Sequence, residues 1–247
     1  MSCRIQIKNA TIVNEGRSFV GSVLIDHDRI DEILTSPDAV PELPADEVVD
    51  ATGCYLLPGV IDEHVHFRDP GLTHKADFST ESLAAAAGGV TTILDMPNTL
   101  PPSVTREAVV EKLSIAAESC HVNFGCFIGA TRTNIDQLRN IMPNLVAGIK
   151  LFMGSSTGEM EVEGDDAITA IFEQSRLPIV VHCEDNATIA ANMKAHKAQY
   201  GDDPDIAHHP AIRSEEACYR STAKAIELAR LTGARLHVFH LSTAAET

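Results

Sequence analysis

The sequence predicts an α/β protein, a (β/α)8 TIM barrel of which about six strand–helix units are present, preceded by a small N-terminal β-sandwich module. From residue 58 onward, apolar strand-like runs alternate with helical stretches at a spacing of mostly about thirty residues, which is typical of parallel strands joined by crossover helices. Polar side chains follow nearly every strand-like run, whereas an open sheet would concentrate them at one switch point. This favours the barrel.

Residues 1–57 form the first predicted domain, the small β module. Apolar residues alternate around Ile5 and Ile7 and again over 19–25, without a helical period. Turn and loop residues at 27–29 and 36–44 separate these short strands. The module carries no evident chemistry.

Residues 58–247 form the second predicted domain, the barrel. The helical stretches begin at capping residues and several end at glycines, which supports their assignment. The predicted strands are Val60–His66, Thr91–Met96, Val122–Ile128, Val146–Phe152, Pro178–His182 and Arg235–Leu241. The predicted helices are Phe78–Ala87, Thr105–Ser119, Ile135–Ile141, Asp165–Gln174, Asn186–Ala198 and Ser214–Leu231. Because only residues 242–247 follow the last strand, we expect a barrel that is incomplete at its C-terminus.

Composition argues against several classes of partner. The 19 basic and 35 acidic side chains give a net charge of −16, the wrong sign for a nucleic acid backbone. No stretch is apolar enough for a membrane span, and the N-terminus lacks the hydrophobic region of a signal peptide. The 6 cysteines form no Cys-x-x-Cys pair, which indicates reduced thiols and a cytoplasmic location.

Two histidines lie at the end of the first predicted barrel strand. Residues two apart share a face of a strand, so His64 and His66 are expected to project together at its end. Two imidazoles at one point make a metal site plausible, although an isolated His-x-His is more often a pair of ordinary, partly buried histidines.

Lys150 lies in an otherwise apolar strand, where an ammonium without a partner is costly. It could form an ion pair with a neighbouring carboxylate. Alternatively, nearby metals could favour the neutral amine, which takes up CO₂ to give an anionic carbamate able to bridge two metal ions.

His182 and His240 each follow an apolar run, on the fifth and sixth strands. Each alone could be a core histidine whose hydrogen bonds are satisfied within the fold. The combination is less easily explained by chance, because the strand ends carry His-x-His, then Lys, then His and then His. Cys183 is left out because the next residue of a strand faces away from His182. The remaining histidines are interpreted as solvated or structural: His27, His74, His121, His196, His208, His209 and His237.

The ordered motifs of the chain resemble the amidohydrolase superfamily and, within it, the type I dihydroorotases. The resemblance covers nearly the whole chain. Its motifs are Pro58 to Gly71, Ala84 to Thr92, Asp95 to Thr99, Gly148 to Phe152, His182 to Asp185 and His240 to Ser242.

The resemblance implies a zinc-dependent cyclic amidase. It implies two Zn²⁺ ions bridged by carboxylated Lys150 and a hydroxide, with His64 and His66 holding one metal and His182 and His240 the other. The implied reaction is the reversible hydrolysis of dihydroorotate to N-carbamoyl-aspartate in pyrimidine biosynthesis. Arg68 and Asn98 are the expected substrate-binding residues, because a guanidinium fork matches a carboxylate.

Other functions stay open at this stage. An allantoinase or a hydantoinase of the dihydropyrimidinase type would share the metal ligands. Arg68, however, favours a dihydroorotase. A non-catalytic homologue could serve as a scaffold in a pyrimidine-pathway complex. The family's catalytic aspartate, which follows the eighth strand, has no counterpart in residues 1–247. The expected partner is a small-molecule substrate, and a homodimer is a candidate assembly.

Overall fold

The computed structural model describes residues 4–36, 38–154 and 160–247. The chain divides into two compact units, Met1–Gly59 and Val60–Thr247, which are described separately below. Cys3 and Pro37, which the sequence analysis counted among the thiols and the loop residues, lie outside the described residues. Every described cysteine is a free thiol.

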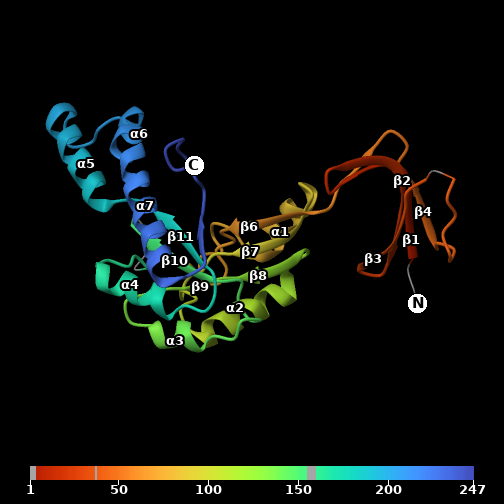
Figure 1. Ribbon diagram of the computed structural model, residues 1–247, viewed down its shortest axis with the longest axis horizontal. Coiled ribbons are helices and arrows are strands. Elements are labelled where there is room, and N and C mark those ends of the chain that lie inside the picture. Colours follow the sequence, from red (N-terminus) through yellow and green to blue (C-terminus); the bar gives the residue numbers. More distant parts are fainter. Residues whose placement is uncertain (1–3, 37, 155–159) are drawn as a thin grey trace. The chain divides into compact units, whose positions relative to one another are not determined.

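The N-terminal unit is built on one five-stranded sheet (Figure 1). Antiparallel pairing joins β1 to β2 and β2 to β3, whereas β4 and β5 pair with β1 in parallel. Ala10, Ile12 and Val23 are buried together on this sheet. The second layer that a sandwich requires stays a prediction. The strands are β1 (Arg4–Asn14), β2 (Arg17–Asp26), β3 (Arg29–Leu34), β4 (Glu47–Asp50) and β5 (Tyr55–Leu56).

The second unit contains parallel strands that lie side by side in chain order. Two runs make up the order, β6-β7-β8 and β9-β10-β11-β12. Only Phe127 separates β8 from β9, and its amide donates to the carbonyl of Asp95 at 3.1 Å, which continues the pairing with β7. The strands are β6 (Val60–Val65), β7 (Val90–Asp95), β8 (Asn123–Cys126), β9 (Ile128–Gly129), β10 (Ile149–Met153), β11 (Ile179–Cys183) and β12 (Leu236–Val238). An open doubly wound sheet would reverse its order, so this arrangement agrees with a barrel.

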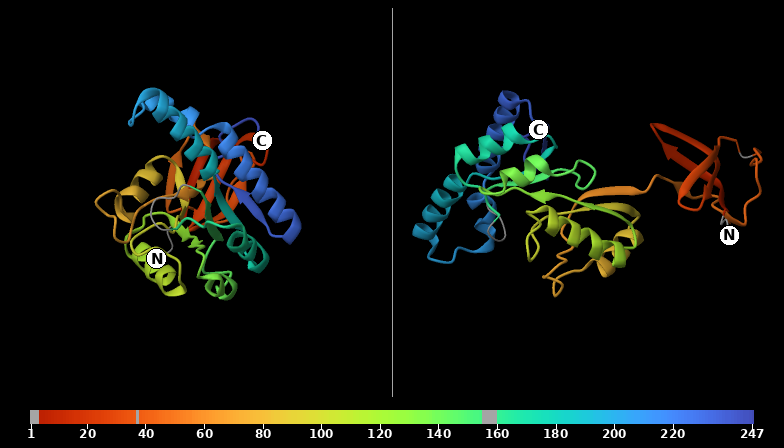
Figure 2. Two further views of the ribbon diagram at one scale, coloured as in Figure 1. Left: turned by 90° about the vertical axis from the view of Figure 1, so that its left-hand side faces the viewer. Right: turned by 90° about the horizontal axis from the view of Figure 1, so that it is seen from below.

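Helices follow the strands and form an arc around them (Figure 2, left). Side chains of Asp77, Thr105 and Asp185 cap α1, α2 and α5, and Gly233 ends α7 in the left-handed conformation. The short η1 and α6 were not predicted. The helices are α1 (Phe78–Ala87), α2 (Arg106–Ser119), α3 (Ile135–Asn140), α4 (Asp165–Gln174), α5 (Asn186–Tyr200), η1 (Ile206–His208), α6 (His209–Ile212) and α7 (Glu215–Thr232).

The two faces of β10 have different surroundings. Ile149, Leu151 and Met153 belong to the main apolar core, together with residues of α4 such as Phe172. The alternate residues Lys150 and Phe152 line a cavity instead. The alternation along this one strand therefore separates the packed core from the candidate site.

Candidate functional site

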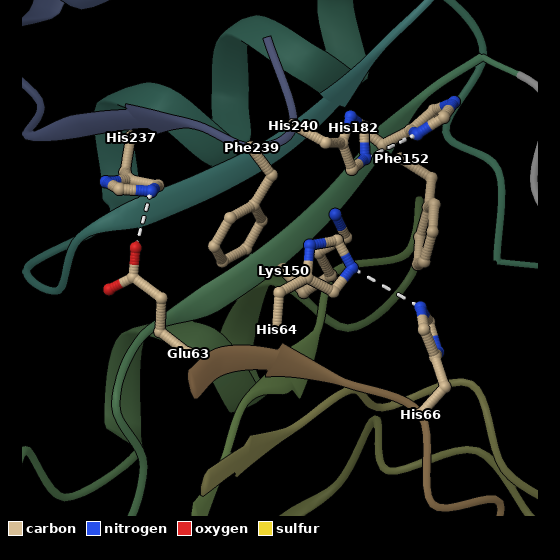
Figure 3. A pocket seen from close by; sticks show the side chains of 9 residues that line it. All are labelled: Glu63, His64, His66, Lys150, Phe152, His182, His237, Phe239 and His240. Atoms are coloured by element: carbon tan, nitrogen blue, oxygen red, sulfur yellow. Dashed lines mark hydrogen bonds and ion pairs between the residues drawn. The ribbon is translucent and has the colours of Figure 1, made fainter. Parts of the chain in front are cut away.

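An open cavity of about 650 Å³ lies at the ends of the strands of the second unit (Figure 3). All five residues that the sequence analysis assigned to a metal centre line it, and they come from four different strands or strand ends. The lining residues are Glu63, His64, His66, Lys150, Phe152, His182, His237, Phe239 and His240.

His64 and His66 meet at the end of β6. Their Nε2 atoms are 3.3 Å apart. The register of β6 against β7 shifts between Asp62 and Val65, and this bulge interrupts the simple alternation of faces. It explains how the adjacent residues Glu63 and His64 can both reach the cavity.

The second nitrogen of His66 contacts Asn98. The Nδ1 atom of His66 is 2.8 Å from Oδ1 of Asn98, which is buried in the segment after β7. Because this carbonyl oxygen can only accept a hydrogen bond, Nδ1 carries the proton and the lone pair lies on Nε2, toward His64. Asn98 was predicted as a substrate ligand, and in the structure it orients a cavity histidine.

His182 and His240 form a second pair. Nδ1 of His182 lies 3.1 Å from Nε2 of His240, and the rings are 4.9 Å apart between centroids. The other nitrogen of His182, Nε2, is 2.8 Å from Oε2 of the buried Glu184. Although burial raises the pKa of Glu184, hydrogen bonds from His182 and Arg213 lower it to about 2.

The surroundings of three cavity histidines, His64, His66 and His240, lower their pKa values. Burial, followed by the charge of Lys150, lowers the pKa of His64 to about 3. Burial and the charge of Arg68 lower the pKa of His66 to about 4. The pKa of His240 is lowered by burial and by His182. A neutral imidazole has the free lone pair that a metal ligand needs.

Lys150 has no polar partner, because its Nζ is buried and makes no hydrogen bond within the described residues. It lies 4.8 Å from the ring centroid of Phe152 and 4.9 Å from that of Phe239. Burial lowers the pKa of Lys150 to about 7. The described residues thus provide no carboxylate partner, and the amine is poised between its charged and neutral forms.

Arg68 lies outside the set of residues that line the cavity. It is half-buried, its φ is 64°, and it makes no ion pair with Asp69 in the described part of the chain. Its charge reaches the cavity through its effect on the pKa of His66. The structure therefore brings together the predicted metal ligands but leaves Arg68 at their border.

The sequence analysis missed several cavity residues. Glu63 and His237 both line the cavity and contact each other, with Oε1 of Glu63 3.1 Å from Nε2 of His237. The sequence analysis had interpreted His237 as solvated or structural. Two phenylalanines, Phe152 and Phe239, supply apolar walls. Phe152 lies two residues from Lys150 on β10, which was the available signal, whereas Phe239 directly follows β12.

Comparison with known proteins places this site in a family. The sequence profile described as "Amidohydrolase family" matches residues 55–237. The chain belongs to the amidohydrolase family.

Individual amidohydrolases are similar over much of the chain. A dihydroorotase of Methanosarcina mazei is 34% identical over 97% of this chain and 51% of its own length. An allantoinase of Deinococcus radiodurans is 36% identical over 82% of this chain and 46% of its own length. The solved L-hydantoinase (dihydropyrimidinase) of Arthrobacter aurescens superimposes with a TM-score of 0.90 at 30% identity, covering 98% of this chain and 54% of that one. The chain spans about half the length of these amidohydrolases.

The donor set of this amidohydrolase is suited to metal ions. Within the described residues, no three His, Cys, Asp or Glu side chains form a ready ligand cluster. The closest nitrogen contacts among the four imidazoles join His64 with His66 and His182 with His240, and the rings of His64 and His240 also lie 5.2 Å apart between centroids. Each pair offers two nitrogen ligands, and the buried Lys150 amine without a partner lines the same cavity. Imidazole nitrogens are common metal ligands, so the chemistry of these residues fits the binding of metal ions.

In the described residues, no helix is long and apolar enough to cross a membrane.

Proposed function

We propose that this amidohydrolase is a dihydroorotase, which catalyses the reversible hydrolysis of the cyclic amide of dihydroorotate to N-carbamoyl-aspartate in pyrimidine biosynthesis. The observation that carries this proposal is the meeting of four histidines and an unpartnered lysine in one cavity. The substrate is inferred from the dihydroorotases of several archaea, which are 33–36% identical to this chain.

In this proposal His64 and His66 would hold one zinc ion, His182 and His240 would hold the other, and Lys150, as a carbamate, would be a ligand of both; all five residues line the cavity. Such metals lower the pKa of a water molecule and polarise an amide carbonyl. The chain prepares these ligands through neutral imidazoles and through the hydrogen bond from His66 to Asn98. The low pKa of Lys150, about 7, leaves a neutral amine for reaction with CO₂.

The substrate carboxylate is assigned to Arg68, at the border of the cavity. A guanidinium can bind a carboxylate through two hydrogen bonds, and in this position it would lie beside the metal held by His66. Asn98 is proposed to border the same substrate. No aspartate of residues 1–247 is proposed for the proton transfer. The β-sandwich, the homodimer and the cytoplasmic location stay proposals for the whole protein.

A second candidate is another cyclic amidase. Allantoinases are 36–38% identical to this chain, as similar as the dihydroorotases, and the L-hydantoinase superimposes with a TM-score of 0.90. Arg68 does not line the cavity, and this position is compatible with a substrate ring that carries no charge.

An assay of the full-length, zinc-loaded protein with dihydroorotate, allantoin and dihydrouracil separates these candidates. We expect turnover of dihydroorotate and formation of N-carbamoyl-aspartate. Preferred hydrolysis of allantoin or dihydrouracil would move the assignment to the second candidate. No turnover of any of the three, with metal bound, would favour a non-catalytic scaffold.

A further inference from the structure

Glu184, which is buried, and Arg213, which is partly exposed, form a contact behind His182, on the side of the imidazole that faces away from His240. Oε2 of Glu184 is 2.8 Å from Nε2 of His182. Arg213 binds the same carboxylate at two points, through Nε to Oε1 at 2.8 Å and through a terminal nitrogen to Oε2. His182 and Arg213 therefore share one carboxylate oxygen.

The contact defines the protonation of His182. An ionised carboxylate only accepts hydrogen bonds, so Nε2 of His182 must carry a proton. In the neutral imidazole the lone pair then lies on Nδ1, the atom 3.1 Å from Nε2 of His240. The nitrogen that faces the cavity is thus the one able to bind a metal ion.

The backbone around Arg213 is anchored on both sides. Nδ2 of Asn192, on α5, donates to the carbonyl of Ile212 at 3.1 Å and to Oγ of Ser214 at 3.2 Å. The amide of Asp185 donates to the carbonyl of Ala217 at 2.9 Å, which ties the residue after Glu184 to α7. The backbone beside Glu184 and around Arg213 is therefore held by contacts with α7 and α5.

We propose that Glu184 and Arg213 are positioning residues, which fix the orientation and tautomer of His182 and thereby set the affinity of the metal that His182 and His240 hold. The inference rests on the ligand set of the proposed function. Carboxylates that hydrogen-bond a metal-binding histidine typically change metal affinity by about 10–100-fold when they are replaced. Arg213 acts one step further out, by holding the carboxylate in place.

The test measures zinc affinity of the full-length protein by competition with a chromophoric chelator. Glu184→Gln keeps the size of the side chain but loses its charge, and we expect about 10–100-fold weaker binding of one of the two zinc ions. Arg213→Met should weaken the same ion by a smaller factor. If Arg213 works through Glu184, the double variant should bind no more weakly than Glu184→Gln alone.

Glu216→Gln is the matched control. It removes an exposed ion pair with Arg220 on α7, at 2.5 Å, and should leave both zinc affinities at the wild-type value. The melting temperature of each metal-free variant separates a loss of stability from a loss of metal affinity. Should Glu184→Gln not fold, Arg213→Lys provides the same test, because lysine keeps the charge but loses the two-point contact.

Wild-type zinc affinity in a folded Glu184→Gln or Arg213→Lys variant would overturn the positioning role. His182→Ala, measured in parallel, tests the ligand set itself. If His182→Ala keeps both zinc ions, the proposed function has the wrong ligands. If it loses one and Glu184→Gln loses none, only the positioning role is wrong.

Discussion

Lys150 shows how the environment of one residue prepares its chemistry. Its amine is buried against the rings of Phe152 and Phe239, and no carboxylate of the described residues neutralises it. Since burial favours the neutral amine, the pKa falls to about 7 and the reactive form is populated near neutral pH.

We expect Lys150→Ala to lose bound zinc and turnover, because it removes the shared ligand of the two histidine pairs. Metal content by elemental analysis and the rate with dihydroorotate are the measurements, and a short carboxylic acid in the buffer should restore part of the activity. Lys224→Ala, which removes an exposed ion pair with Asp165, is the control. A Lys150→Ala protein with wild-type zinc content and rate would contradict the bridging role.

Arg68 provides the test of substrate identity. If its guanidinium binds the substrate carboxylate, Arg68→Met should cost roughly 1.5–3 kcal/mol, or about one to two powers of ten in kcat/KM for dihydroorotate. Arg68→Lys should recover part of this loss, since it keeps the charge without the planar fork. Zinc content should stay unchanged in both variants. Lower stability with intact kinetics would instead indicate that Arg68 shapes the loop after β6.

At the level of elements, a fully buried ion pair joins β7, α2 and the segment after β6. Nζ of Lys112, on α2, lies 2.5 Å from Oδ2 of Asp95 and 2.6 Å from the carbonyl of Met96. Oδ1 of Asp95 accepts from the amide of Phe67, the residue after His66, at 2.8 Å. The strand β7, the helix α2 and the segment that follows the His64–His66 motif thus meet at one ion pair whose side chains are fully buried.

Lys112→Met should lower the free energy of unfolding by about 3–5 kcal/mol, because it leaves the carboxylate of Asp95 buried without its partner. Denaturant unfolding of the metal-free protein measures this change. Glu111→Met, at an exposed position of the same helix, should change stability by less than about 0.5 kcal/mol. A loss in Lys112→Met no larger than in this control would show that the pair contributes nothing to stability.

The elements were largely predictable because strands and helices leave periodic patterns. The predicted helix Phe78–Ala87 has the bounds of α1, and Asp165–Gln174 has those of α4. Other details depend on tertiary contacts. The last strand is shorter than predicted, at Leu236–Val238 instead of Arg235–Leu241, and the third divides at Phe127 into β8 and β9. No local pattern marks these interruptions.

Residue type and position on a strand were sufficient to predict the candidate ligands of the site. They could not predict contacts between residues that lie far apart in the chain. Four histidines and Lys150 were found because each ends or interrupts an apolar strand. The contact between Glu184 and Arg213 spans 29 residues and follows only from tertiary packing, in which α7 lies against β11 and α6 lies against α5. The hydrogen bond of Asn98 to His66 was hidden for the same reason.

For the whole molecule, the cavity histidines couple stability to pH. The pKa values of His64 and His66 fall from 6.5 in the unfolded chain to about 3 and about 4 in the folded protein. Between these limits the unfolded state binds more protons than the folded state, so acid favours unfolding. The stability that the two groups contribute is present above pH 6.5 and is lost as the pH falls.

We therefore expect the free energy of unfolding of the metal-free protein to decrease between about pH 6.5 and pH 5, as measured by denaturant titration with chelator present. His64→Gln should flatten this dependence, because glutamine does not titrate. His27→Gln, at an exposed position of the N-terminal unit, should keep the wild-type slope. Equal slopes in all three proteins would show that the cavity histidines do not control the acid response.

The sequential order of the strands also has a consequence for how the protein is made. Within the runs β6-β7-β8 and β9-β10-β11-β12, every strand after the first pairs with the strand that precedes it in the chain, so each run can grow one strand at a time during synthesis on the ribosome. His64 belongs to the first of these strands and His240 follows the last. The four histidines and Lys150 that line the cavity therefore come together only when β12 has paired with β11. If the ligands of the proposed function are right, both histidine pairs become available to metal ions only after this strand has paired.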